Sequence, residues 1–150
     1  MAAPDFQIST VAQVIQLAVA PVFLLSGVGI MLTVLTGRLA RVVERAREVE
    51  AAAKSAAPTD YPLHQQQLQV LGRRARLMNR AITLCTLCAL LVAFVVVTLF
   101  VGAFVQFRLA AAIALMFIVA MLSFIAALLC FLREVFLAIA SLRIGVKIPK

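Results

Sequence analysis

Few residues of this sequence have side chains that make or break bonds at neutral pH. There is one histidine, His64, and the three cysteines are Cys85, Cys88 and Cys130. A Ser-His-Asp set would depend on His64 alone, which lies in a proline-rich turn where a histidine is usually a polar surface residue. The two cysteines three residues apart lack the further ligands that zinc needs. No glycine-rich phosphate-binding loop follows a strand pattern. We therefore expect no catalytic residue, no metal site and no cofactor, and predict that the protein is not an enzyme.

Arginine stands out by number and spacing, and its guanidinium group binds carboxylates and phosphates. The segment from Arg38 to Arg80 holds nine basic and four acidic residues, and the chain carries a formal charge of +8. The simpler interpretation is that these charges only fix the topology and keep a loop soluble. The alternative is contact with anionic lipid headgroups or a cytoplasmic protein partner, for which seven residues are candidates: Arg38, Arg41, Arg45, Arg73, Arg74, Arg76 and Arg80.

The elements that must position these arginines are long and apolar. Hydrophobic residues make up 65% of the chain, whereas a soluble domain is about half apolar. No charged residue occurs between Asp5 and Arg38. None occurs between Arg80 and Arg108, or between Arg108 and Arg133. Each run exceeds the roughly 20 residues with which a helix crosses a bilayer, so we predict an all-α integral membrane protein with three transmembrane helices.

The basic segments of the chain predict its orientation, because short loops rich in Lys and Arg stay in the cytoplasm. Both the loop after the first span and the C-terminal piece are basic, whereas Arg108 stands alone on the other side. We expect the N-terminus outside and the C-terminus inside. The predicted segments are an extracytoplasmic N-terminus (1–10), transmembrane helices at 11–37, 81–104 and 109–132, a cytoplasmic hairpin (38–80) and a cytoplasmic helical extension and tail (133–150).

Apolar residues in the loop between the first two spans recur with the spacing of a coiled coil. They are Leu39, Val42, Ala46, Val49 and Ala53 before the two prolines, and Leu68, Leu71, Ala75, Met78 and Ile82 after them. The two series match in reverse order, which predicts an antiparallel helical hairpin with its tip at 57–63. This register sets Arg45 opposite Arg74, a like-charge pair that costs stability unless an anionic group lies between them.

Two further patterns concern contacts between helices. Glu134 is the one acidic residue near the cytoplasmic end of the third span, and we expect it to form an ion pair with Arg38 or Arg80 at the same depth. Small residues share one helical face in the first span (Ser26, Gly29, Thr33, Thr36) and one in the third (Ala120, Ser123, Ala127). Such faces let membrane helices approach closely, either within one chain or between copies of a homo-oligomer.

Two other functions compete with a self-associating, lipid-contacting or partner-contacting membrane protein. An oligomeric pore or small-solute transporter would need a polar path, for which the candidates are Ser26, Thr33, Thr36, Thr98 and Gln106. Nucleic-acid binding fits the net charge alone, and we do not expect it because Tyr61 is the only aromatic residue of the basic loop on which bases could stack.

Three ordered stretches resemble one bacterial membrane-protein family, the domain of unknown function numbered twenty-seven twenty-one. They are PVFLLSGVGIMLTVLTGRLARVVERAR (21–47), RRARLMNRAI (73–82) and FLREVFLA (131–138). The resemblance implies a small three-span protein of the bacterial plasma membrane and assigns no activity. The recurrent polar positions that it implies are Ser26, Gly27, Arg38, Arg41, Arg45, Arg47, Arg73, Asn79, Arg80 and Glu134.

Overall fold

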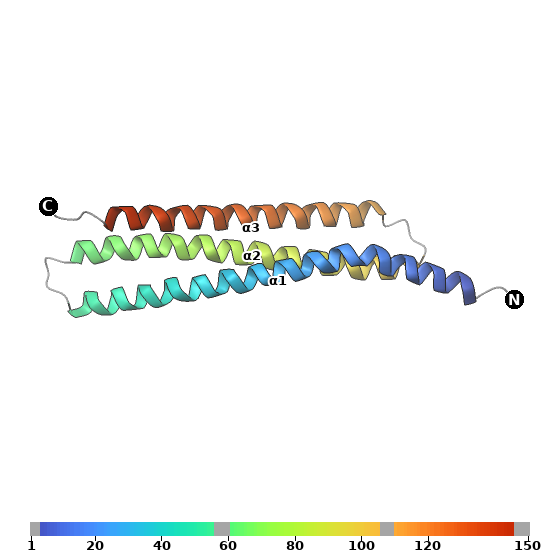
Figure 1. The fold of residues 1–150 in the computed structure, drawn as a ribbon, viewed down its shortest axis with the longest axis horizontal. Helices are drawn as coiled ribbons and strands as arrows, with labels where there is room; N and C mark the ends of the chain where they lie inside the picture. Colours follow the sequence, from blue (N-terminus) through green and yellow to red (C-terminus); the bar gives the residue numbers. More distant parts are fainter. Residues whose placement is uncertain (1–3, 56–60, 106–109, 146–150) are drawn as a thin grey trace. The chain divides into compact units, whose positions relative to one another are not determined.

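The described part of the chain forms three long helices. The computed structural model describes residues 4–55, 61–105 and 110–145, and all of these residues are helical. Helix α1 is Pro4–Ser55, α2 is Tyr61–Val105 and α3 is Ala110–Gly145 (Figure 1). The prediction of an all-helical chain is confirmed.

Each helix is long and apolar enough to cross a membrane. The candidate spans are Val11–Lys54, Tyr61–Gly102 and Ala110–Ile139. Helical structure follows from the composition, since lipid offers no partners to backbone polar groups and a helix satisfies all of them internally. The 52 residues of α1 extend for about 78 Å, well beyond the roughly 30 Å of a hydrocarbon core. The three apolar spans predicted from the charge-free runs are therefore present. Helix α1 is much longer than the segment 11–37 that was predicted to cross the bilayer.

The helix ends differ from two predicted boundaries. Helix α1 begins at Pro4, so most of the predicted N-terminal segment is helical. Helix α2 begins at Tyr61, so residues 61–63 belong to it and not to a tip. Pro62 permits this, because the first turn of a helix has no use for the backbone N–H that proline lacks. The rest of the predicted tip, the turn at 106–109 and the tail after Gly145 lie outside the described residues.

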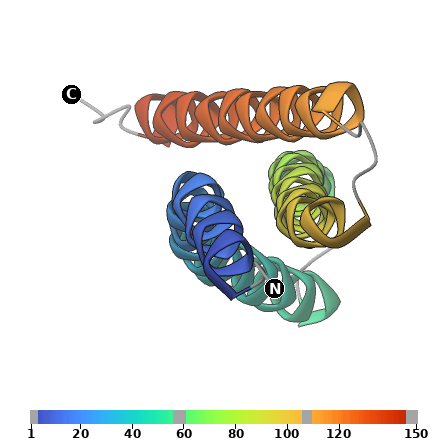
Figure 2. The same cartoon turned by 90° about the vertical axis from the view of Figure 1, so that its right-hand side faces the viewer.

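The chain divides into two compact units, and each unit takes a part of every helix. The first unit comprises Met1–Leu32 with Leu84–Ile125, and the second comprises Thr33–Thr83 with Ala126–Lys150. In Figure 2, the parts that belong to the first unit are the blue N-terminal part of α1, the yellow to olive C-terminal part of α2 and the light-orange start of α3.

The core of the first unit is built from small and β-branched residues, which bring membrane helices close together. Its buried side chains include Val14, Ala18, Pro21 and Val28 of α1, Cys85, Cys88, Val92 and Val95 of α2, and Ala120 and Ser123 of α3. Large apolar side chains lie outside this core: Phe23 is 74% exposed, Ile30 69% and Leu115 63%. Helices that bury small residues and expose large apolar ones are suited to lipid and not to water.

The second unit contains the basic part of the chain. All ten residues of the two predicted coiled-coil series are buried or half-buried, and Val42, Val49 and Met78 are the most deeply buried of them. Leu35 of α1, Ala81 of α2 and Ala127 of α3 complete this apolar core. One charged residue lies in the same core, Glu134 of α3, and its side chain has no exposed surface.

Candidate functional site

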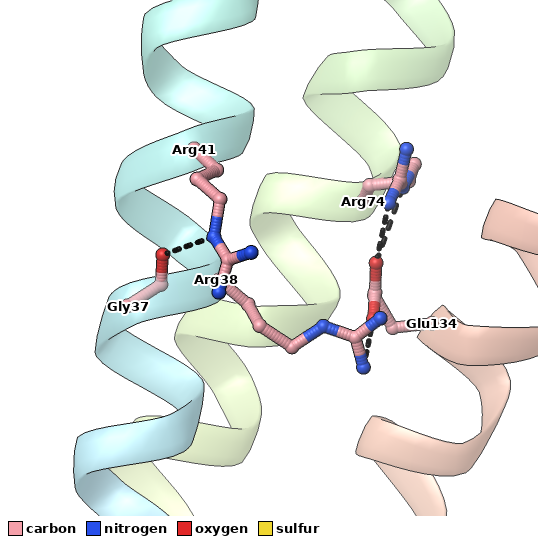
Figure 3. Close-up of polar contacts among 5 residues, drawn as sticks. All are labelled: Gly37, Arg38, Arg41, Arg74 and Glu134. Carbon is pink, nitrogen blue, oxygen red and sulfur yellow. Dashed lines mark hydrogen bonds and ion pairs between the residues drawn. The ribbon is translucent and has the colours of Figure 1, made fainter.

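Glu134 is a buried carboxylate that two arginines contact from two different helices. Arg74 of α2 donates from both Nε and Nη2 to Oε1 of Glu134, at 3.2 and 2.8 Å. Arg38 of α1 places Nη1 3.4 Å from Oε2 of the same carboxylate. Figure 3 shows both guanidinium groups turned toward Glu134 on α3. Within the second unit, the three helices therefore meet in one charged cluster.

Burial explains why this carboxylate needs two arginines. An ionised group removed from water without a partner costs several kcal/mol, so buried charges are found paired. The side chains of Arg38 and Arg74 are 30% and 20% exposed, so both guanidinium groups keep partial access to the surroundings. Oε2 of Glu134 nevertheless has no hydrogen-bond donor, because Arg38 reaches it at ion-pair distance only. The carboxylate is thus held firmly through Oε1 and more loosely through Oε2.

Arg38 is also oriented by an aromatic ring. Its guanidinium carbon lies 5.1 Å from the centre of the Phe131 ring, within the distance at which a cation is attracted to an aromatic face. Phe131 precedes Glu134 by three residues on α3, so ring and carboxylate lie on the same side of that helix. One turn of α3 therefore supplies both contacts that hold Arg38.

Beside this cluster lies a hollow lined by arginines, with a volume of about 250 Å³. Arg38, Arg41 and Arg45 line it from α1 and Arg74 lines it from α2. Its apolar lining consists of Val42, Leu71 and Met78. We refer to this feature as the arginine hollow. It brings together Arg45 and Arg74, the two cations that the predicted register sets opposite each other.

Two of the arginines in the hollow have contacts along their own helix. Arg45 pairs with Glu48 at 2.8 Å, and Nε of Arg41 donates to the Gly37 carbonyl at 3.4 Å (Figure 3). Two more exposed pairs lie on α1, Arg47–Glu44 at 3.9 Å and Lys54–Glu50 at 3.3 Å. Exposed pairs at this spacing contribute only a few tenths of a kcal/mol each.

The seven arginines predicted as anion contacts fall into two groups. Arg38 and Arg74 are half-buried and contact Glu134, whereas the other five are exposed: Arg41, Arg45, Arg73, Arg76 and Arg80. Of the two partners expected for Glu134, Arg38 lies beside it and Arg80 does not. Arg74 takes that place; it lies six residues before Arg80 on α2, so the two side chains leave the helix on different sides. The sequence did give one indication for Arg74. The predicted register sets it opposite Arg45, and two like charges at that distance require a nearby anionic group to be stable.

The two small-residue faces have different surroundings. On α3, Ala120 and Ala127 are fully buried and Ser123 is 9% exposed, so this face packs within the chain. On α1, the four residues of the predicted face are all exposed: Ser26, Gly29, Thr33 and Thr36.

The hydroxyl groups expected along a polar path bond to their own helices. The Ser26 hydroxyl donates to Val22 O at 3.3 Å, and the Thr36 hydroxyl to Thr33 O at 3.1 Å. Thr98 donates to Phe94 O at 2.7 Å. Hydroxyls satisfied in this way are compatible with lipid and do not favour a water-filled path. Gln106 lies outside the described residues.

The charged groups of the candidate site are arginines and the carboxylates of Glu134 and Glu48. Across residues 11–54, 61–102 and 110–139, no three His, Cys, Asp or Glu side chains are grouped as metal ligands would be. The arginines that line the hollow are suited to binding anionic groups.

Comparison with known proteins places the chain in a family. A family model described as "Protein of unknown function (DUF2721)" matches residues 18–144, which include Arg38, Arg74 and Glu134. No curated protein and no solved structure matches the chain. The match covers most of the sequence and confirms the resemblance drawn from its three ordered stretches. The chain therefore belongs to the DUF2721 family of proteins of unknown function.

Proposed function

We propose that this chain is a non-enzymatic protein of the bacterial plasma membrane that presents an arginine-rich cytoplasmic hairpin to anionic lipid headgroups. A cytoplasmic protein with an acidic surface is the alternative partner. The observation that carries the proposal is the exposure of five arginines in the second unit, Arg41, Arg45, Arg73, Arg76 and Arg80, of which only Arg45 forms an ion pair with a described residue. Each arginine near an anionic leaflet contributes about 1 kcal/mol to attraction.

The proposed hairpin rests on the burial pattern and on the charge distribution. The two coiled-coil series lie on the covered sides of α1 and α2, as an antiparallel pair requires. The arginines flank these series near the ends of the charge-free runs. When those runs fill the hydrocarbon core of a bilayer, the arginines lie at the depth of the lipid headgroups. The positive-inside rule assigns this side to the cytoplasm, with the N-terminus outside.

Anionic-lipid enrichment around the protein tests the lipid interaction. Protein extracted with its surrounding lipid at low salt should retain a larger fraction of phosphatidylglycerol than the bulk membrane. Replacing Arg73, Arg76 and Arg80 together by Gln should abolish most of the enrichment, since about 3 kcal/mol of attraction is removed. The matched Lys triple variant keeps the charge and should retain it. Equal enrichment in the Gln and Lys variants, or none in the wild type, contradicts the proposal.

We also propose that the protein self-associates through the exposed small face of α1. A Cβ atom added to Gly29 or to Gly27 would meet nothing within 4 Å, so both glycines can be enlarged without disturbing a single chain. Gly29 lies on the small face, whereas Gly27 lies on a different side of the helix.

Matched substitutions at these glycines test the interface. Gly29→Leu should lower the cross-linked dimer severalfold in native membranes, because close helix approach is lost. Gly27→Leu should leave the dimer unchanged, and neither substitution should change the melting temperature of the monomer. Equal dimer in both variants and in the wild type would show that this face is not the interface.

A further inference from the structure

We propose that the arginine hollow is a discrete binding site for one phosphate group, carried either by a lipid headgroup or by a soluble phosphate ester. This inference rests on the proposed function and deepens it, because general attraction to an anionic surface needs no defined site. Four arginines from two helices line the hollow, namely Arg38, Arg41, Arg45 and Arg74. Guanidinium groups bind phosphate oxygens through paired, charge-assisted hydrogen bonds.

The charge of the cluster favours a phosphate group. Two of the four arginines that line the hollow, Arg38 and Arg74, pair with Glu134, and Arg45 pairs with Glu48. Four positive and two negative charges leave the hollow with two uncompensated positive charges. A phosphate monoester carries about −1.5 to −2 charges at neutral pH, which nearly balances this surplus. Among the described residues, Arg41 has no acidic partner and its Nε donates only to a backbone carbonyl. Arg41 is therefore the arginine with the most binding capacity left for a ligand.

The size and lining of the hollow limit what it can hold. Its volume of about 250 Å³ lies below the range of roughly 300–1,000 Å³ for pockets that enclose drug-sized ligands. It fits a phosphate group with a short attached fragment and is too small to enclose a nucleotide. Val42 and Met78, which are 6% and 1% exposed, form an apolar part of its wall. Hydrogen bonds to a phosphate are stronger beside such a wall than in bulk water, because the local dielectric constant is lower.

Glu134 acts in this site as a positioning residue. Its Oε1 accepts two hydrogen bonds from Arg74, and its Oε2 lies beside Arg38, so two of the four guanidinium groups are fixed at the hollow before any ligand arrives. A site whose groups are already ordered loses less entropy on binding. Arg38 approaches Oε2 of Glu134 through Nη1 only and at ion-pair distance, so its other N–H groups can donate to a phosphate.

The test uses full-length protein in nanodiscs of zwitterionic lipid, with two probes in separate arms. One arm adds phosphatidic acid to the bilayer, and the other adds glycerol 3-phosphate to the solution. Binding is followed by melting temperature and by native mass spectrometry at about 0.5 M salt, where the Debye length is about 4 Å and diffuse attraction is screened. We expect saturation at one phosphate per chain in at least one arm, and the arm that saturates identifies the source.

Three substitutions separate a defined site from diffuse charge. Arg41→Gln should weaken binding at least about tenfold, as expected when hydrogen bonds to a charged group are lost. Arg76→Gln removes the same charge from an exposed position outside the hollow and should change binding less than about twofold at this salt. Arg41→Lys keeps the charge but lacks the planar fork, so it should also weaken binding.

Each contrary outcome has a distinct meaning. Absence of one-to-one binding in both arms overturns the phosphate site, and so does an equal effect of Arg41→Gln and Arg76→Gln. Unchanged binding in Arg41→Lys shows that only charge matters and likewise overturns it. If phosphatidylglycerol enrichment at low salt persists in these cases, the proposed function stands without the site. If that enrichment is also absent, the proposed function fails as well.

Discussion

Glu134→Gln is expected to lower the free energy of unfolding by about 3 kcal/mol, because removing one partner of a buried ion pair leaves the other without compensation. Here the substitution leaves Arg38 and Arg74 without the carboxylate that both of them contact. Partial exposure of both arginines holds the cost near the lower end of the range for buried pairs. The chain has no tryptophan, so melting is best followed by a thiol-reactive dye that reports exposure of the buried Cys85 and Cys88.

Glu48→Gln is the matched control for this prediction. Glu48 pairs with Arg45 at 2.8 Å, the same distance as the shortest contact between Glu134 and Arg74. The Glu48 side chain is 56% exposed whereas that of Glu134 is fully buried, so burial is the main difference. Exposed pairs contribute about 0–1 kcal/mol, and the melting temperature of this variant should hardly change. Equal effects at the two positions would show that the Glu134 cluster does not stabilise the fold.

A double-mutant cycle then separates the ion pair from the general effect of substitution. Arg74→Gln alone leaves the buried Glu134 with Arg38 as its one charged partner. The double variant removes charges of both signs, so its cost should be clearly smaller than the sum of the two single costs. Additive costs would mean that the two side chains are not coupled.

Ala120→Leu is expected to destabilise the first unit by about 1–3 kcal/mol, because added methyl groups in a filled core force neighbouring side chains and backbone to move. Ala120 has no exposed surface on α3. Ala114→Leu is the matched control on the same helix, since Ala114 is exposed and added apolar surface there faces lipid. The melting temperature should fall in the first variant and stay level in the second. The reverse order would place the packed face of α3 on its other side.

The helices were predictable because their cause is local in the sequence. The charge-free runs 6–37, 81–107 and 109–132 are long enough to cross a bilayer. In lipid, a helix satisfies all backbone polar groups of such a run internally. The start of α2 at Tyr61 was not predicted, because Pro62 signals a turn as well as a first helical turn. A sequence does not decide between those two uses of proline.

The site was predictable only in part. Depth along the spans predicted Arg38 or Arg80 as the partner of Glu134, and the structure has Nη1 of Arg38 3.4 Å from Oε2 of Glu134. Arg74 was missed as its partner because its contact depends on how α3 lies against α2, which periodicity on each helix does not determine. The small-residue faces were likewise predictable only in part. Spacing shows that Ser26 and Gly29 share one face of α1 and that Ala120 and Ser123 share one face of α3. Only the packing of the helices decides that the face on α3 is buried and the face on α1 is exposed.

The central claim is that the protein spans a membrane and that its arginines lie on the cytoplasmic side. Reporter fusions in the segment between α1 and α2 test this claim most directly. A fluorescent protein that matures only in the cytoplasm and a phosphatase active only outside are each inserted after Asp60 and, separately, after Lys150. The account predicts fluorescence and no phosphatase activity at both positions. Phosphatase activity without fluorescence at Asp60 would place the arginines outside the cell and contradict it.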